Sequence, residues 1–448
     1  MTLKVVGQRK KRYDGLAHAS GETTFVDDVH VPGMLMVKAY RSPVVKGKIR
    51  SIDISEAEDL PGVAGIITHQ DVPVNAYGLR KDQPILAEKN ICYQGEPIAA
   101  VAAADEPTAL KAVGLIKADI EAEEHVFDPL EAMKPGAPEV RPGGNLFKFG
   151  DRDFQEIEMG DVEAGFEEAD YIVEGEYFHP AAEHAPMEPQ VSLAVPESDG
   201  RLTIHTVSQA ISLNSDRIAG VLNLKPGGSQ SDFQEKTGLR SIRYVGGTVG
   251  GGFGAKVDLH ADPVTALLAL KTGCPVKWRW TREEEMLYST HSGAWYVRVR
   301  DGVRKDGRIV ARQIRSIRDA GAHTRVNPFI INKHCFMATG PYDIPNVRIR
   351  GYCVFTNKAP AAAMRGFGVP PAAFATEVQM DKIAHKLGIS PWEIRFINAV
   401  RNKDKTVTGR VLNSVYLVEA MQALARKAKV ELPENLMKMT SAPREESA

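Results

Sequence analysis

The stretch "YVGGTVGGGFGAK" (Tyr244–Lys256) places six glycines within thirteen residues. Glycine lets main-chain N–H groups approach a ligand where any Cβ would collide. A turn that binds nothing has little need of three consecutive glycines, because each one costs conformational entropy on folding. Two kinds of ligand fit such a loop: a nucleotide phosphate, or another bulky anionic cofactor.

The nucleotide interpretation rests on the match of Gly250–Ala255 to the dinucleotide-binding pattern G-x-G-x-x-A. A predicted strand precedes the match and a predicted helix follows it. Glu283 ends the next predicted strand, where a ribose-binding carboxylate would lie. However, Glu283 falls within Thr281–Glu284, a helix-capping box that already accounts for an acid there. The Walker A pattern fails outright, because Ala255 separates the last glycine from Lys256.

The composition argues against several classes of protein. The 448 residues include 56 Lys and Arg against 57 Asp and Glu, so a nucleic-acid partner is not expected. No apolar run approaches the roughly 20 residues of a membrane-spanning helix, and the N-terminus lacks the apolar block of a signal peptide. The four scattered cysteines form no CxxC pair, so the chain does not ligate an iron–sulfur cluster in the usual all-cysteine way. We therefore expect a cytoplasmic protein with neither a nucleic-acid nor a membrane partner.

The order of predicted elements indicates a mixed α/β (α+β) fold in two domains. The first domain, 1–133, has predicted strands near 33–42 and 62–67, then a strand, an Ala-rich helix and a strand over 96–124. The Pro- and Gly-dense segment 134–144 is the predicted linker. The second domain, 145–435, contains the glycine loop, a helix that starts at 262 and ends at Gly273, and a second capped helix start at Ser390. Residues 436–448 form a polar tail that we expect to be frayed.

Six further segments occur in an order and at distances typical of one family. They are "YQGEPIAAVAA" (93–103), "GDVEAGFEEADYIVEGEY" (160–177), "EHAPMEPQ" (183–190), "TVSQA" (206–210), "GPYDIPNVRIRGYCVFTN" (340–357) and "AAMRGFGVPP" (362–371). Together with the glycine loop they resemble the molybdenum hydroxylases, the xanthine dehydrogenase and aldehyde oxidase family, from about residue 13 to 424. The resemblance implies a hammerhead domain followed by the first half of a molybdopterin-binding domain.

The resemblance also assigns cofactor-binding residues. In that family a pterin dithiolene holds the metal, which agrees with the lack of a cysteine ligand set here. Gln209 stands where a side chain hydrogen-bonds an oxygen ligand of molybdenum, so it acts on the metal indirectly. Gly252, Phe253 and Gly254 correspond to the loop whose backbone approaches the same oxygen, and Arg365 to an arginine whose backbone lies against the metal site.

Three more positions bear on the substrate. Phe367 matches an aromatic residue beside the bound substrate, although a buried core phenylalanine is the alternative. Val257 stands where xanthine-oxidising members carry Glu, and Lys333 where they carry a substrate-facing Arg. Lysine lacks the bidentate fork of arginine. Xanthine is therefore disfavoured, and a surface lysine is the alternative for Lys333.

The resemblance implies partners as well. The family's molybdenum subunit normally continues for several hundred residues and ends with a catalytic Glu. We find no such motif in this chain, and we do not assign that role to Glu183 or Glu188. We expect a subunit divided between two chains, as in nicotinate dehydrogenase, with the catalytic Glu on the partner chain. Iron–sulfur clusters and FAD would lie on other subunits.

The expected function is hydroxylation of an electron-poor C–H of an N-heteroaromatic, nicotinate-like substrate with water as oxygen source. The cofactor is expected to be molybdopterin cytosine dinucleotide with a sulfido or selenido ligand on molybdenum. An aldehyde or a CoA thioester is the alternative substrate. From other classes, a nucleotide-binding dehydrogenase or a catalytically silent scaffold remains open. The extended connection 225–238 has no assigned role.

Overall fold

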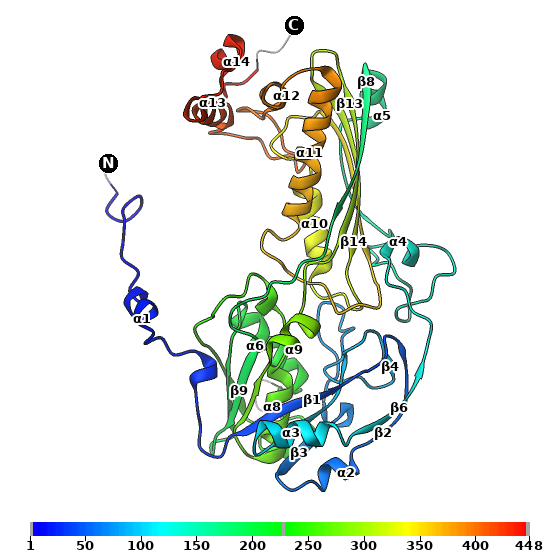
Figure 1. Ribbon diagram of the computed structural model, residues 1–448, viewed down its shortest axis with the longest axis vertical. Coiled ribbons are helices and arrows are strands. Elements are labelled where there is room, and N and C mark those ends of the chain that lie inside the picture. The colour runs from blue at the N-terminus through cyan, green and yellow to red at the C-terminus, as the bar shows by residue number, and fades with distance from the viewer. Residues whose placement is uncertain (1–2, 226–228, 445–448) are drawn as a thin grey trace.

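The computed structural model describes residues 3–225 and 229–444, and the chain forms two lobes (Figure 1). One lobe is built on a seven-stranded and a three-stranded sheet, the other on a five-stranded sheet. We call them the seven-stranded lobe and the five-stranded lobe. The mixed α/β class is confirmed.

The seven-stranded sheet has the strand order β11-β10-β9-β12-β1-β5-β3. Its strands are β1 (Leu35–Arg41), β3 (Val63–Ile67), β5 (Pro97–Ala103), β9 (Val191–Pro196), β10 (Arg201–Thr206), β11 (Ser241–Gly246) and β12 (Val276–Arg279). Three of these strands precede the predicted linker and four follow it. They join where β1 runs parallel to β12, with Leu35 opposite Val276 and Met36 opposite Lys277. The sheet therefore crosses the boundary between the two predicted domains.

Helix α8 (Asp262–Thr272) packs on this sheet, and one apolar core binds the two halves of the lobe together. That core contains Val37 and Ala100 from before the linker and Val264, Leu267 and Val276 from after it. The helix ends as the sequence predicts, with Gly273 in the left-handed conformation at φ +68 and its N–H bonded to Ala269 O.

The three-stranded sheet, in the order β4-β2-β6, flanks the first part of the chain. Its strands are β2 (Gly47–Asp53), β4 (Asn90–Ile91) and β6 (Lys117–Ala122), and the short elements nearby are α1 (Gly15–Ser20), η1 (Val26–Asp28), α2 (Ser55–Glu58), η2 (His69–Asp71) and α3 (Glu106–Val113). The predicted strand–helix–strand order over 96–124 is confirmed as β5, α3 and β6.

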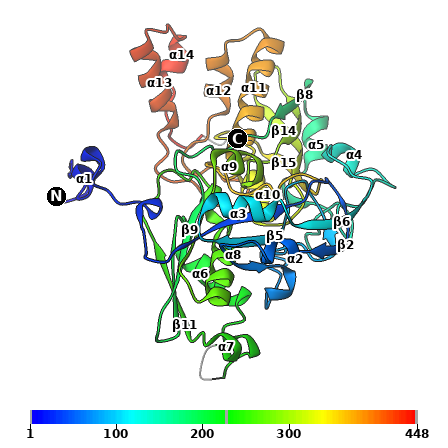
Figure 2. The same ribbon diagram turned by 60° about the horizontal axis from the view of Figure 1, so that its bottom comes forward.

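The five-stranded sheet has the order β7-β15-β14-β13-β8. Its strands are β7 (Gln155–Met159), β8 (Tyr171–His179), β13 (Trp295–Val303), β14 (Ile309–Asp319) and β15 (Asn346–Val354). Figures 1 and 2 show α10 (Asn327–Met337) and α11 (Val369–Leu387) along one face of this sheet. Helices α4 (Pro129–Ala132) and α5 (Val162–Glu167) pack toward β14 from the opposite face.

Capping residues fix several helix starts as predicted. Thr281 and Glu284 form the reciprocal capping box of α9 (Arg282–Tyr288), and the Ser390 side chain accepts from the Glu393 N–H at the start of α12 (Pro391–Asn398). The remaining elements are α6 (Ile211–Val221), α7 (Asp232–Thr237), η3 (Ala255–Val257), α13 (Leu417–Ala428) and α14 (Glu434–Lys438).

The structure adds detail at one stretch and differs from the expectation at another. The extended connection 225–238 contains α7, which Ser231 and Gln234 cap, while 226–228 lie outside the described residues. The expected frayed tail is instead packed up to residue 444. Ser441 donates to Glu419 Oε2 at 2.6 Å, and Arg444 lies 2.7 Å from Asp404 Oδ2. Residues 445–448 are outside the described range. None of the described helices is both long and apolar enough to cross a membrane.

Candidate functional site

Two loops meet backbone to backbone at the predicted site. The glycine loop (residues 246–256) follows β11, and the arginine loop (residues 362–368) precedes α11. The Arg365 N–H donates to Phe253 O at 2.8 Å. Gly254 has φ +114, and a Cβ there would collide with the carbonyl oxygen of Ala363. Only glycine at this position permits the two loops to approach so closely.

Gln209 holds the glycine loop through its side chain. Its Oε1 accepts hydrogen bonds from the backbone N–H groups of Gly254 at 2.9 Å and Lys256 at 3.3 Å. In addition, the backbone N–H of Gln209 donates to Lys256 O at 2.8 Å. A Cβ at Gly252 would lie 2.5 Å from Gln209 Oε1, so glycine is needed there as well. Because Oε1 faces two donors, Nε2 points elsewhere, and none of the described residues accepts a hydrogen bond from it.

Phe253 presents an unpaired backbone donor next to this amide. Its φ is +53, a left-handed conformation that costs a non-glycine residue about 1–3 kcal/mol. Its side chain is 46% exposed, and within the described chain nothing accepts its N–H. Phe367 in the arginine loop is also left-handed, at φ +51. Strained backbone in both loops, at their junction, is a common feature of ligand-binding sites.

A buried ion pair holds the glycine loop against the segment that contains Glu188. Lys256 is 1% exposed, and its Nζ lies 2.7 Å from Glu188 Oε2. The same carboxylate oxygen accepts the Gly250 N–H at 2.8 Å. Burial lowers the pKa of Lys256, and the Glu188 carboxylate opposes that lowering. His184, from the same segment as Glu188, places Nε2 2.7 Å from the Ala363 carbonyl oxygen of the arginine loop.

Sequence reasoning identified the loops but not this support. The segment "EHAPMEPQ" was recognised by resemblance, yet its contact with the glycine loop has no local pattern in the sequence. The one available signal was Lys256 itself, a charged residue between the glycine loop and the apolar Val257. Glu188 acts as a structural partner in this geometry.

The three substrate-related positions are spread over three elements. Val257 and Phe367 are both partly buried and pack against the core of the five-stranded lobe. Lys333 is exposed on α10, and no hydrogen bond or ion pair within the described residues involves it. The structure thus brings Gln209, Gly252, Phe253, Gly254 and Arg365 together, whereas Lys333 stands on a neighbouring helix.

The nucleotide interpretation is wrong for this fold. A dinucleotide fold needs the strand after the glycine loop to lie parallel beside the strand before it. Here β10 and β9 separate β11 from β12, and β12 runs antiparallel to β9. Glu283 does not end a strand: it is an exposed residue in the first turn of α9, after β12 has ended at Arg279.

The loop junction fits an anionic cofactor held through an oxygen. It offers the Phe253 N–H and the Gln209 Nε2 as free donors, and Gly252 leaves room for the Gln209 side chain beside the loop. A cation has less to bind there. The described chain does bring Cys92, Glu96 and His323 within 4.8 Å of one another. However, Glu96 already accepts from the Cys92 N–H at 2.7 Å and contacts His323 Nε2 at 3.0 Å, so that cluster is internally satisfied on the carboxylate side.

Comparison with known proteins agrees with this geometry. Residues 146–399 match the molybdopterin cofactor-binding domain, and residues 20–124 match the a/b hammerhead domain of aldehyde oxidase and xanthine dehydrogenase. The chain belongs to the molybdenum hydroxylase family. Within this family it is 32% identical to the nicotinate dehydrogenase large molybdopterin subunit of Eubacterium barkeri, over 95% of this chain and 96% of that one.

Other molybdenum hydroxylases are longer. A probable xanthine dehydrogenase subunit of Bacillus subtilis is 35% identical over 88% of this chain and 51% of its own length. The structure of aldehyde oxidoreductase from Desulfovibrio gigas superposes with a TM-score of 0.85 at 29% identity, covering 96% of this chain and 47% of that one. The chain thus spans about half the length of these two relatives and nearly all of the Eubacterium subunit.

Proposed function

We propose that this chain is one of two chains that together bind the molybdopterin cofactor of a molybdenum-dependent hydroxylase. The observation that carries the proposal is the pair of free donors at the loop junction, the Phe253 N–H and the Gln209 Nε2. The end-to-end match to a large molybdopterin subunit supports the division into two chains.

In this proposal the chain's residues bind and orient the cofactor. Gln209 and Phe253 donate to an oxygen of the cofactor, and Gly252 and Gly254 let it approach. Arg365 keeps the arginine loop in place through its backbone bond to Phe253. When bound, the cofactor supplies oxidation of an electron-poor C–H with water as oxygen source. We propose the cytosine dinucleotide form, with a sulfido or selenido ligand.

The partner chain would cover an apolar surface next to the site. Helix α10 exposes Phe329, Phe336 and Met337 together with Lys333, and α11 exposes Phe374. Exposed apolar residues gathered on adjacent helices mark an interaction surface. We propose that the second molybdopterin-binding chain, with the catalytic Glu, binds here. Subunits with iron–sulfur clusters and FAD complete the proposed complex, in the cytoplasm.

The proposed substrate is an N-heteroaromatic acid. A partner chain over α10 would enclose Lys333, whose ammonium then offers a counter-charge to a carboxylate. Phe367 and Val257 supply apolar contacts for a ring. The second candidate is an aldehyde, because a relative that matches 96% of this chain is named an aldehyde oxidoreductase.

We also propose the following domain boundaries. The hammerhead domain comprises residues 1–133, the linker 134–144, the first half of the molybdopterin-binding domain 145–435, and the polar tail 436–448.

Molybdenum content, measured by mass spectrometry on natively purified protein with its co-purifying chains, tests the proposal. We expect about one molybdenum per copy of this chain. Gln209→Ala removes both the free donor and the acceptor of two loop amides, so we expect a loss of most of the metal, at least tenfold. Gln94→Ala, an exposed glutamine on a distant turn, is the control and should retain it. Absence of both molybdenum and pterin from the wild-type complex would refute the proposal.

A further inference from the structure

A second site lies close to the glycine loop, between the seven-stranded lobe and the turn that follows β14 of the five-stranded sheet. A cavity with about 40 Å³ of space for water-sized molecules is lined by residues that include Arg41, Arg325, Trp278, Trp280 and Gln83. This volume exceeds the roughly 10–15 Å³ that one water needs. The cavity adjoins the site described above through His260, whose Nε2 donates to the Ala255 carbonyl oxygen at 3.2 Å.

The cavity wall carries many unpaired donors and few acceptors. Six buried donor atoms have no hydrogen-bond partner among the described residues: Arg41 Nε and Nη2, Arg325 Nε and Nη1, and the indole Nε1 of Trp278 and of Trp280. Gln83 Oε1 is an unpaired acceptor in the same wall. Buried polar groups without partners cost about 1–3 kcal/mol each, so their concentration in one place indicates a missing acceptor.

Within the described residues, each buried guanidinium group faces a carboxylate, but at a distance longer than a hydrogen bond. Arg325 is 5% exposed, and the side chain of Arg41 is 10% exposed. The nearest carboxylate of Arg41 is Glu284 at 3.9 Å, which Lys38 also approaches at 3.3 Å. That of Arg325 is Asp258 at 3.6 Å, which Arg217 contacts more closely at 3.0 Å. Each carboxylate is therefore shared between two cations.

The surroundings are electropositive and rigidly positioned. Desolvation lowers the pKa of Arg41, as expected for a buried cation with too little compensation. Burial, with the charge of Arg325, keeps the pKa of His260 well below its usual value. Arg325 itself has φ +42, a left-handed conformation that is strained for a non-glycine residue. The Arg41 guanidinium lies 5.2 Å from the Trp280 ring centroid and 4.2 Å from that of Tyr288, which fixes its plane.

We propose that this cavity binds one small inorganic anion of the halide class, between Arg41 and Arg325. An anion can accept from several of these donors at once, whereas waters would add further hydrogens to a wall that has few acceptors. The anion would join β1, the strand that carries Arg41, to the turn after β14 that carries Arg325. It thereby stabilises the base of the glycine loop.

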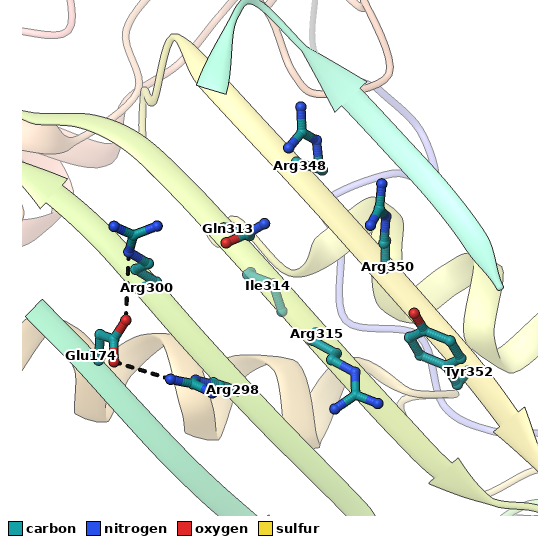
Figure 3. Close-up of a pocket in the computed structure, with 9 residues that line it drawn as sticks. All are labelled: Glu174, Arg298, Arg300, Gln313, Ile314, Arg315, Arg348, Arg350 and Tyr352. Carbon is teal, nitrogen blue, oxygen red and sulfur yellow. Dashed lines mark hydrogen bonds and ion pairs between the residues drawn. The ribbon is translucent and has the colours of Figure 1, made fainter. Parts of the chain in front are cut away.

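A larger basic depression elsewhere on the molecule differs from this cavity, because its arginines are paired with carboxylates or exposed to water. On the open face of the five-stranded sheet, Figure 3 shows arginines from β13, β14 and β15 around a depression of about 450 Å³. Four of them have carboxylate partners: Arg298 and Arg300 with Glu174 at 3.1 and 3.5 Å, Arg348 with Glu158 at 2.6 Å, and Arg350 with Glu156 at 2.5 Å. Arg315 is exposed to water. These cations are already neutralised or hydrated and need no ligand.

Bromide diffraction tests the proposal directly. Crystals of the purified protein, with any co-purifying chains, are grown in sodium bromide and measured at the bromine edge. We expect an anomalous peak in the cavity, in contact with both guanidinium groups. Bromide peaks on the surface with none in the cavity would overturn the proposal. So would a cavity filled only by waters or by a side chain of another chain.

A solution measurement separates specific binding from binding at crystal concentrations. Thermal unfolding is followed while chloride replaces isethionate at constant ionic strength. We expect Tm to rise by about 1.5 °C per tenfold increase in chloride above its Kd. Arg325→Gln should lose this response, and Arg315→Gln, the exposed control in Figure 3, should keep it. An equal chloride response in wild type and Arg325→Gln would refute the site. If Arg325→Gln does not fold, the bromide result on wild type decides.

Discussion

Gly254 is where backbone conformation and the candidate site are most directly linked. We expect Gly254→Ala to lower the free energy of unfolding by at least about 2 kcal/mol, because a Cβ would be strained at φ +114 and would collide with Ala363. Urea unfolding measures the change. The matched control is Gly220→Ala in α6, where a Cβ meets no atom within 4 Å and alanine should stabilise the helix by about 0.5–1 kcal/mol. Equal effects of the two substitutions would contradict this account.

Lys256 and Glu188 make a second prediction for single residues. Lys256→Met leaves the Glu188 carboxylate buried without its cation, so we expect a loss of about 3–5 kcal/mol in stability. The double variant Lys256→Met with Glu188→Gln should recover part of that loss, because no unpaired charge remains. A double-mutant cycle by urea unfolding measures the coupling. Strictly additive losses would show that the pair does not act as a unit.

At the candidate site, the sequence predicts which residues take part but not how they contact one another. Gln209 and the glycine loop are assigned to the site by their resemblance to the family's motifs, and that assignment stays a prediction. That Gln209 uses its oxygen on the loop and keeps its nitrogen free depends on side-chain orientation, which sequence does not encode locally. The support from Glu188 and His184 depends on tertiary contact in the same way.

Among the elements, α10 links the sheet to the arginine loop through one buried histidine. The neutral His334 ring donates from Nδ1 to Gly368 O at 2.9 Å and accepts at Nε2 from the Ser316 hydroxyl at 2.8 Å. Burial lowers the pKa of His334 from 6.5 to about 4. Protonation therefore favours the unfolded chain, and the stability from His334 is present above pH 6.5 and is lost as pH falls toward 4.

This shift predicts how His334→Gln changes the pH profile. The loss in wild type between pH 6.5 and 4 from this one group is about 3 kcal/mol. We expect the variant to be less stable than wild type at pH 7 and the difference to shrink toward pH 4, in urea unfolding at each pH. His385→Gln, an exposed position on α11, is the control and should keep a constant difference. A His334→Gln difference that does not change with pH would contradict the prediction.

Local patterns predicted several elements but not their pairing. The strand at β5, the helix α8 with its terminal glycine, the capping box of α9 and the Ser390 N-cap of α12 follow from apolar runs and cap chemistry. The parallel contact of β1 with β12 joins residues about 240 apart in the chain and has no local signal. For the same reason, the predicted linker does not indicate whether the seven-stranded sheet ends before it or continues beyond it.

At the scale of the whole molecule, the shared sheet implies cooperative unfolding across the linker. Val37 in β1 is 2% exposed and belongs to the same core as α8 and β12. Val37→Ala should cost about 2 kcal/mol, by lost burial and a small cavity. We expect amide hydrogen exchange to become about 30-fold faster in β5 and also in residues 262–279, beyond the linker. Exchange measured by mass spectrometry resolves these segments.

Val347→Ala, the same substitution at a buried position of β15, is the control and should instead accelerate exchange first in the five-stranded sheet. If the effect of Val37→Ala ended at the linker, residues 1–133 would be an independent folding unit, and the continuous seven-stranded sheet would not determine the stability of this lobe.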